Sequence, residues 1–399
     1  MTKTSRTILV TDGEQRAALA LARSLGRAGY CVCVCSSRRR SLAGASRYCR
    51  REAKVSDALT DPEAFLADVI SLVRTWNVDV LIPVTEAALL SILPERTRFG
   101  TVQIPFADAE TFRKVSDKEL VLRTARRLGI GVPEQWTLAC RDGLASADRD
   151  ALAFPLVIKP SRSVGEHQGH RVKLNVRYAA DQRQLDAQLA EIDATAYPLL
   201  LQRQVLGPGV GVFLLLWEGR TLAVFSHRRI REKPPSGGVS VYRESIPADP
   251  SLVEHSRALL EHFGWKGVAM IEYKLDETSG TPYLMEINGR FWGSLQLAVD
   301  AGVDFPALLL AAAAGEPPTP VVNYRAGVRS RWWWGDVDHL LARLRSSTSP
   351  PELQTHVQSK WRAFREFLVL WRPGDRNEIL RLDDPRPFLR ETIEWLKGR

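Results

Sequence analysis

The sequence predicts a mixed α/β protein in which a parallel α/β unit precedes a larger α+β region and a mainly helical C-terminal segment. Strand-like and helix-like segments alternate over roughly the first hundred residues, the pattern of a parallel sheet with crossover helices. Longer apolar strands and glycine-rich turns dominate from residue 154 to residue 295. Tryptophan-rich segments with helical spacing follow beyond residue 320.

The composition is that of a globular protein with room for two or three domains. The chain has 399 residues, of which 45% are hydrophobic and 25% are charged. No apolar run approaches the roughly 18 residues needed to span a membrane. The N-terminus enters a strand without the apolar region of a signal peptide. We therefore expect a cytosolic protein without a membrane span.

The net charge of +9 does not identify a partner. The basic residues are scattered and their densest run, Arg38-Arg39-Arg40, is short, so we expect no nucleic-acid partner. Cys31, Cys33 and Cys35 alternate and would share one face of a strand. Because no CxxC pair accompanies them, a buried and reduced strand is favoured over a soft-metal site.

Capping and turn signals mark the elements of the N-terminal unit. Asp61-Pro62 is a helix start with proline at the first helical position, and Gly29 ends an alanine- and leucine-rich helix. Glu86 follows the last strand of the unit. The predicted elements are strands over 6–13, 30–36 and 78–84 and helices over 14–29 and 61–76.

A dinucleotide site is the alternative interpretation of this unit. The arginines at 38–40 follow the second strand, where the 2′-phosphate of NADP would be held. However, the first turn, Thr11 to Arg16, lacks the G-x-G-x-x-G pattern. An NADP-dependent oxidoreductase stays open as a remote alternative.

The most informative stretch is Pro282 to Leu295, PYLMEINGRFWGSL. Glu286, Asn288 and Arg290 follow an apolar strand at a spacing of two and would face the same side. A second acid, Glu272, lies on another strand-like run. Carboxylate and amide oxygens suit Mg²⁺, and arginine suits phosphate or carboxylate, so the pattern fits metal-assisted phosphoryl transfer. An edge strand that ends in solvated polar residues is the alternative.

Two lysines occupy positions that suit contact with an anion. Lys118 lies in the first turn of a helix that Ser116 or Asp117 would cap, where a cation opposes the helix dipole. Lys159 follows an apolar strand and precedes a polar loop with Gly165 and Gly169. Such a loop can act as a lid over phosphates, although no Walker sequence is present and an ordinary hairpin fits as well.

A group of arginines precedes a Pro-Pro-Ser-Gly-Gly turn. Arg228, Arg229 and Arg231 would be costly to bury unless they meet anions. They form either a solvent-facing ribbon or part of a pocket for a carboxylate or phosphate. Our hypothesis is that they contribute, with Gly237 and Gly238 of the turn, to the site for a carboxylic acid.

The C-terminal part begins at a proline-rich segment, Pro317 to Pro320. Trp332-Trp333-Trp334 cannot all share one helix face, so we expect some of them to pack on the preceding domain, with a role at the substrate site left open. Aromatic and aliphatic residues at helical spacing predict an amphipathic helix over 352–371 that packs on the body of the protein. These are Trp361, Phe364, Phe367, Leu368 and Trp371.

In their order and spacing, these motifs resemble the ATP-grasp superfamily, closest to the carbamoyl-phosphate-synthase-like carboxylate–amine ligases. The resemblance covers residues 1–320 approximately. It implies a Rossmann-like pre-ATP-grasp domain over 1–110, an ATP-grasp domain over 111–320 and a helical extension over 321–399. The ATP-grasp domain would have a small lobe over 135–205 and a large lobe over 206–320. The motifs are Lys118 in SDKELVLRTARRLGIGVP, Lys159 in FPLVIKP, Gln202 to Gly207 in LLLQRQVLG, Glu272 in GVAMIEYK, and Glu286, Asn288 and Arg290 in MEINGRFWGSL.

The resemblance implies a nucleotide site between the two lobes. Lys118 and Lys159 would contact the phosphates of ATP, and Lys159 would also approach the adenine. Ser161 and Gly165 would belong to the lid. The hinge strand, Gln202 to Val205, would present Gln202 and backbone groups to the adenine. The family often has glutamate in this hinge, whereas here Arg203 could contact ribose or phosphate.

The resemblance also implies the metal ligands and the reaction. Glu272, Glu286 and Asn288 would hold one or two Mg²⁺ ions, with Mn²⁺ as an alternative, and Asn288 and Arg290 would act at the transferred phosphoryl group. A carboxylate would become an acyl phosphate, which an amine would convert to an amide. A noncatalytic ATP-binding protein, a carboxylase and a carboxylate kinase stay open. The expected partners are a small carboxylic acid and an amine, and a homodimer is an open alternative to a monomer.

Overall fold

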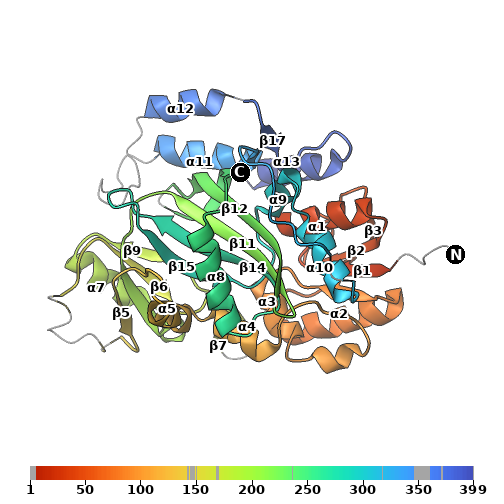
Figure 1. Cartoon of the computed structure of the whole chain (residues 1–399), viewed down its shortest axis with the longest axis horizontal. Helices are drawn as coiled ribbons and strands as arrows, with labels where there is room; N and C mark the ends of the chain where they lie inside the picture. Colours follow the sequence, from red (N-terminus) through yellow and green to blue (C-terminus); the bar gives the residue numbers. More distant parts are fainter. Residues whose placement is uncertain are drawn as a thin grey trace.

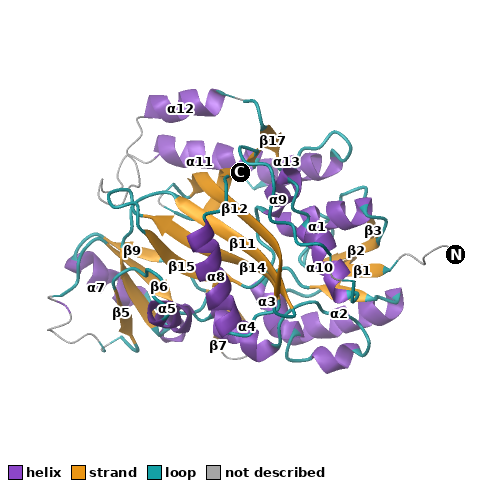
Figure 2. Cartoon of the chain, in the orientation of Figure 1, coloured by secondary structure: helices purple, strands orange, loops and turns teal. Residues whose placement is uncertain are grey.

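The computed structural model describes residues 6–398 apart from 142, 144–148, 150, 168–169, 236, 317, 346–359 and 370–371. A parallel N-terminal sheet, a small antiparallel sheet and a large sheet organise the chain (Figure 1, Figure 2). The mixed α/β architecture expected from the sequence is confirmed. The domain limits at 110 and 320 stay predictions.

The N-terminal sheet has the strand order β3-β2-β1-β4, with all neighbours parallel. Its predicted strands and helices are present, and Asp61 caps its helix by accepting a hydrogen bond from the Ala64 amide. The edge strand β3 was not predicted, because its sequence, CRREAK, has no apolar pattern. Cys33 and Cys35 are buried, and all five cysteines are free. The elements are β1 (Thr7–Val10), α1 (Arg16–Arg27), β2 (Cys31–Ser36), β3 (Cys49–Lys54), α2 (Pro62–Trp76), β4 (Val80–Ile82) and α3 (Glu86–Ile92).

The small sheet follows two helices, and its strand order is β5-β10-β6-β9. Asp117 caps α5, as one of the two expected caps, by accepting from the Leu120 amide. A separate hairpin, β7–β8, leaves the end of β6. The elements are α4 (Ala109–Ser116), α5 (Lys118–Arg127), β5 (Gln135–Leu138), β6 (Leu156–Pro160), β7 (Val164–His167), β8 (His170–Lys173), β9 (Arg177–Ala179), α7 (Gln182–Glu191) and β10 (Leu199–Arg203).

The large sheet has seven strands in the order β15-β14-β11-β12-β13-β16-β17. Its centre, VFLLLW of β11, is buried on both faces, which explains a continuous apolar run in place of alternation. The elements are β11 (Gly209–Trp217), β12 (Arg220–Lys233), β13 (Val239–Ser245), α8 (Pro250–His262), β14 (Gly267–Leu275), β15 (Pro282–Asn288), α9 (Leu295–Ala301), α10 (Phe305–Ala313) and β16 (Arg329–Arg331), with α11 (Trp333–Arg345), α12 (Lys360–Leu368), β17 (Asp375–Asn377) and α13 (Arg386–Lys397) following.

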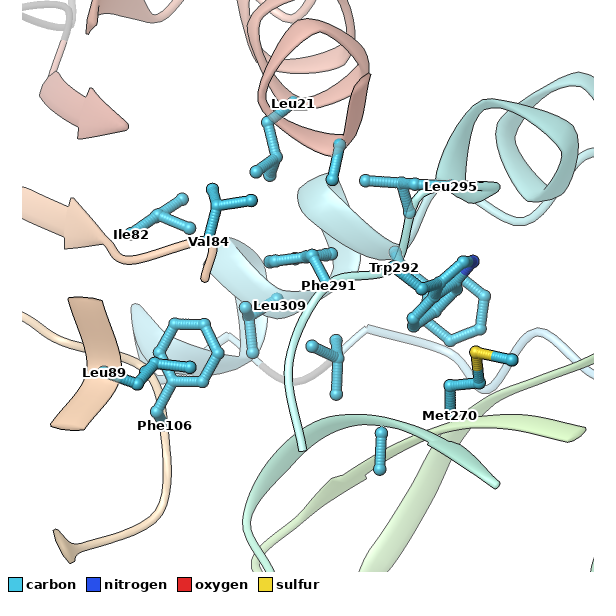
Figure 3. Packing of buried hydrophobic residues seen from close by; sticks show 14 of the residues in the cluster. Leu21, Ile82, Val84, Leu89, Phe106, Met270, Phe291, Trp292, Leu295 and Leu309 are labelled. Atoms are coloured by element: carbon cyan, nitrogen blue, oxygen red, sulfur yellow. The ribbon is translucent and has the colours of Figure 1, made fainter. Parts of the chain in front are cut away.

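One continuous core joins the N-terminal unit to the large sheet. Figure 3 shows Phe291 and Trp292 between side chains of the N-terminal sheet and helices, such as Val84, and Met270 of β14. Phe291 also meets Phe106 edge to face, with ring centroids 6.3 Å apart. The two sheets are therefore fixed relative to each other beside the carboxyl end of β15.

The C-terminal segment is mainly helical and adds two short strands to the large sheet. The three adjacent tryptophans separate as expected: the Trp332 ring lies 4.0 Å from the Arg16 guanidinium of α1, and Trp334 stacks on Trp395. Of the predicted helix over 352–371, residues 360–368 form α12, whereas 352–359 and Trp371 lie outside the described residues, as does Pro317.

No single helix among the described residues has the length and apolarity of a membrane span. In the same part of the chain, the pair α9 and α10, bent by 90° at their junction, reaches that length and composition together.

Buried ion pairs hold the C-terminal segment on the N-terminal unit. Arg23 of α1 donates to Asp384 at 2.9 Å, and the two side chains are 1% and 0% exposed. Asp384 also accepts from the Ser46 hydroxyl and the Arg47 amide. The adjacent Asp383 pairs with Arg27 at 2.8 Å, but these side chains are 44% and 40% exposed.

The two neighbouring aspartates therefore offer a matched test of this attachment. Asp384→Ala leaves Arg23 buried without its counter-charge and should lower the free energy of unfolding by about 3–5 kcal/mol. Asp383→Ala removes a solvated pair and should cost at most about 1 kcal/mol. Urea unfolding of both variants measures the difference. Equal losses would contradict the assignment of Asp384 as the buried anchor.

Candidate functional site

Two carboxylates lie opposite each other at the junction of the sheets. In the antiparallel register of β14 and β15, Glu272 pairs with Glu286. The two side chains are only 15% and 29% exposed. Because like charges directly across a sheet repel, the pair needs cations close by. The structure supplies them from several elements.

Glu286 begins a chain of hydrogen bonds along the carboxyl end of β15. The Asn288 amide donates to Glu286 at 2.9 Å, and Arg290 donates to the Asn288 oxygen at 3.2 Å. The convergence expected from the spacing of two is therefore present, although β15 ends at Asn288. The buried rings of Phe291 and Trp292 hold the following turn and so fix the direction of Arg290.

Both predicted lysines meet this carboxylate end. The Lys118 ammonium donates to the Ser163 hydroxyl at 2.8 Å and lies 3.7 Å from Glu286. Lys159, on β6 of the small sheet, reaches across to the Met285 sulfur at 3.8 Å. The site therefore lies where the small sheet faces β14 and β15 of the large sheet.

Burial and neighbouring charges shift the pKa values of Lys159, Glu272 and Glu286 in different directions. Burial lowers the pKa of Lys159 to about 8, even though Glu286 and Glu272 oppose the shift. Burial raises the pKa of Glu272, with Arg229 opposing it. At Glu286, burial alone would raise the pKa, but Lys118, the bond from Asn288 and Lys159 outweigh it, and the pKa is lowered.

Glu86 is a residue of this site that the sequence reasoning did not assign. It is the first residue of α3, at the carboxyl end of β4, where open parallel sheets place their ligands. Burial raises its pKa, while Arg290 and Lys118 lower it. Within the described residues its carboxylate makes no hydrogen bond or ion pair. Its position directly after a strand was the only signal in the sequence.

The hinge strand, β10, is the neighbour of β6, the strand that carries Lys159, in the small sheet. Gln202 is buried on β10 and donates to Gln135 of β5 at 2.7 Å. Arg203 is exposed, and its amide donates to the Glu134 carbonyl at 2.9 Å. Val205 lies two residues beyond the end of the strand. Their contact with an adenine stays a prediction.

The predicted lid is anchored at its start. The Ser161 carbonyl accepts from the Lys118 amide at 2.8 Å, and Gly165 lies on β7. A Cβ at Gly165 would lie 3.1 Å from Leu174, so the absence of a side chain permits close packing within the hairpin.

The arginines of β12 already have anionic partners. Arg228 pairs with Glu244, and Arg231 pairs through two nitrogens with the buried Asp336. Arg229 bonds Glu272 at 2.5 Å and Glu232 at 2.7 Å. Of the three, Arg229 touches a predicted metal ligand directly.

The turn after β12 is tied to the same arginine. Arg229 donates to the Gly238 carbonyl at 3.2 Å. Gly237 has a φ of +129°, which only glycine adopts readily, and a Cβ there would lie 3.0 Å from the Tyr178 hydroxyl. Both glycines therefore lie beside the carboxylate end of the site.

The donor set suits a hard divalent cation that shares its coordination with phosphate. No group of three or more histidine, cysteine or acidic side chains within the described part of the chain forms a metal cage. Two opposed carboxylates and an amide oxygen, surrounded by lysine and arginine, are the few protein ligands that Mg²⁺ takes beside phosphates.

Comparison with known proteins finds a family match over part of the chain. The family described as "ATP-grasp in the biosynthetic pathway with Ter operon" matches residues 195–334. A putative D-alanine–D-lactate ligase of Streptomyces coelicolor is 27% identical over 235 residues, which cover 54% of this chain. The chain spans 64% of the length of that relative.

Solved structures agree on the fold. The L-amino acid ligase of Bacillus licheniformis has a TM-score of 0.61 at 18% identity, covering 79% of this chain and 77% of its own. The ADP complex of N5-carboxyaminoimidazole ribonucleotide synthetase has a TM-score of 0.64 at 14% identity, covering 92% and 97%. The biotin carboxylase of Campylobacter jejuni has a TM-score of 0.63 at 14% identity, covering 81% and 74%. The chain has the ATP-grasp fold.

The lowered pKa of Lys159 predicts a pH dependence of nucleotide binding. Lys159 carries its charge below pH 8 and loses it as the pH rises through its pKa of about 8. The dissociation constant for ATP should therefore increase above pH 8, by up to about tenfold per pH unit. Calorimetry from pH 6.5 to 9.5 measures it. Lys159→Arg keeps its charge and should give a flat profile, and equal profiles for both proteins would contradict the role of Lys159.

Proposed function

We propose that this protein is an ATP-dependent ligase that joins a carboxylic acid to an amine through an acyl phosphate. The observation that supports this most is the opposed pair Glu272 and Glu286, surrounded by Lys118, Lys159 and Arg290 where the two sheets meet. Phosphoryl transfer needs positioning and charge neutralisation more than covalent chemistry, and this cluster offers both.

Each residue of the cluster has a part in the first step. Lys118 and Lys159 bind the phosphates of ATP, and Arg290 holds the γ-phosphoryl group as an oxygen of the acid attacks phosphorus and ADP leaves. Glu272, Glu286 and Asn288 would hold Mg²⁺, which neutralises phosphate oxygens when bound. Gln202, Arg203 and Val205 line the adenine end, and Ser161 and Gly165 cover the phosphates.

The acid is proposed to bind beside β12. Arg229 touches Glu272 and the Gly238 carbonyl, so a carboxylate placed near it would also lie near the phosphoryl acceptor position. Arg228 and Arg231, which pair with Glu244 and Asp336, lie on the same strand, and Gly237 and Gly238 shape the turn. Acid binding here needs at least one of these arginines to exchange its present partner.

Glu86 is proposed to serve the amine. An ammonium substrate is bound by an anionic partner and must lose one proton before its nitrogen can attack the acyl carbon. The nitrogen loses a second proton as phosphate leaves and the amide forms. Glu86 has no hydrogen-bond or ion-pair partner for its carboxylate in the described part of the chain, its pKa is raised by burial, and it lies in the field of Arg290. A carboxylate of raised pKa is a suitable acceptor for one of these protons.

The relatives suggest which acceptors to compare. The Streptomyces coelicolor relative is named for ligation to D-lactate, a hydroxy acid, and the Bacillus licheniformis structure is an L-amino acid ligase. Two further neighbours are a carboxylase and a carboxyaminoimidazole ribonucleotide synthetase. Amino acids, hydroxy acids and bicarbonate therefore belong in one assay.

The first test is ADP release from ATP and Mg²⁺ across carboxylic acids, with amino acids, hydroxy acids and bicarbonate as second substrates. We expect turnover that depends on an acid and an amine, because the cluster supports acyl-phosphate formation. Glu286→Ala should lower it by at least about a hundredfold. If a hydroxy acid is the second substrate that supports turnover, the reaction is ester ligation. If bicarbonate takes that place, the reaction is carboxylation. Turnover with the carboxylic acid and no second substrate would indicate carboxylate phosphorylation. ATP binding without turnover would support a noncatalytic protein.

The role of Glu86 predicts a separable defect. Glu86→Gln keeps the shape but removes the anion, so amide formation should fall by roughly 10²–10⁴-fold and the KM for the amine should rise. Acid-dependent ADP release should fall less, since it precedes amine attack. Product and ADP are measured in the same reaction. Equal losses of both would place Glu86 in the first step instead.

A further inference from the structure

Two neighbouring residues of β8 connect the β7–β8 hairpin to the N-terminal unit. The His170 Nδ1 lies 2.7 Å from the Thr60 carbonyl oxygen, and Arg171 makes the larger set of contacts. The Arg171 guanidinium, on β8, donates to the Ser91 hydroxyl at 2.5 Å and to the carbonyls of Ala87 at 3.2 Å and Leu90 at 3.3 Å. Its backbone amide donates to the Leu59 carbonyl at 2.8 Å. These acceptors belong to α3 and to the loop before α2.

Part of this contact matches the chemistry of a helix end, because Leu90 and Ser91 lie in the last turn of α3, whereas Ala87 lies in its first turn. The last carbonyls of a helix lack partners within it and carry partial negative charge, so a cation there is favourable. Arg171 supplies several fixed donors to this end of α3. Burial lowers the pKa of Arg171, yet an arginine remains charged. The remainder of β8 faces solvent, as Val172 is 46% exposed.

Within the described residues, Arg171 makes most of the hydrogen bonds between the hairpin and the N-terminal unit. β7 and β8 form a two-stranded sheet that joins none of the larger sheets. An isolated hairpin is marginally stable in water, so its docking contacts decide where it lies. At its base, the Ser163 hydroxyl accepts from Lys118, which itself lies beside Glu286. The hairpin therefore connects α3, the helix whose first residue is Glu86, to the part of the site around Lys118 and Lys159. This part, where the phosphates are proposed to bind, is called the phosphate end of the site.

We propose that Arg171 is a positioning residue that latches the hairpin onto α3 and thereby keeps it over the phosphate end of the site. The hairpin covers the site only while this latch holds it against the N-terminal unit. The catalytic consequence rests on the proposed function: a covered site protects the acyl phosphate from water until the amine attacks. An unlatched hairpin lets water take the place of the amine.

Hydrogen exchange tests the latch without any assay of activity. In Arg171→Ala, exchange of the amides at 170–174 should be about tenfold faster or more, because the docked state is lost. Lys173→Ala, an exposed neighbour on the same strand, is the matched control and should leave exchange unchanged. Arg171→Lys keeps the charge with fewer donors and should restore part of the protection. Equal exchange in Arg171→Ala and the control would overturn the latch.

The ratio of amide formed to ADP released tests its consequence. Arg171→Ala should lower this ratio several-fold, whereas Lys173→Ala should leave it at the wild-type value. A ratio unchanged in Arg171→Ala would overturn the protective role. If the wild-type protein turns over no substrate, the proposed function fails, while the exchange experiment still decides whether Arg171 holds the hairpin.

Discussion

The repulsion between Glu272 and Glu286 is the constraint on which the site depends. The strand register places these carboxylates directly opposite each other, where like charges destabilise a sheet. Three elements outside the two strands compensate: α5 supplies Lys118, β6 supplies Lys159, and β12 supplies Arg229. A bound cation would relieve the same repulsion. The repulsion between the two carboxylates thus favours both the approach of the small sheet with its lysine and the binding of a metal ion. The elements around the carboxylates supply positive charge.

The N-terminal unit completes the site because it is joined rigidly to the large sheet. Phe291 and Trp292, directly after Arg290, fill the core between them, so the arginine proposed to hold the phosphoryl group is positioned by two buried rings. The C-terminal segment reinforces this junction from the other side. Glu378 lies between Arg16 of α1 and Arg243 of β13 and pairs with both. Since an unpaired buried charge is costly, these pairs favour a single docking geometry of the C-terminal segment.

Much of this architecture could be predicted from local signals. Caps and apolar periodicity located α2, α5 and the strands β14 and β15, and the spacing of Glu286, Asn288 and Arg290 predicted their convergence. What the sequence could not reveal depends on distant partners. The strand β3 has no apolar pattern because an edge strand with charged residues forms through pairing to β2. Glu86 and Arg171 look like ordinary surface residues in the sequence, and only the packing of α3 against the site and the hairpin distinguishes them.

The position of Arg229 links metal binding to acid binding under the proposed function. Burial would lower the pKa of Arg229, but Glu272 and Glu232 outweigh it and raise the pKa, so the group is a permanent cation. In the structure it neutralises Glu272, which is also a proposed metal ligand. A divalent cation at Glu272 would take over that neutralisation and leave the guanidinium near the β12–β13 turn with Glu232 as its remaining carboxylate partner and with donors free for a second anion. A carboxylate substrate supplies that anion. Arg229 would then stabilise the metal-free protein and recognise the acid in the metal-loaded one. Its two roles would alternate because Glu272 can pair with either the guanidinium or the metal ion.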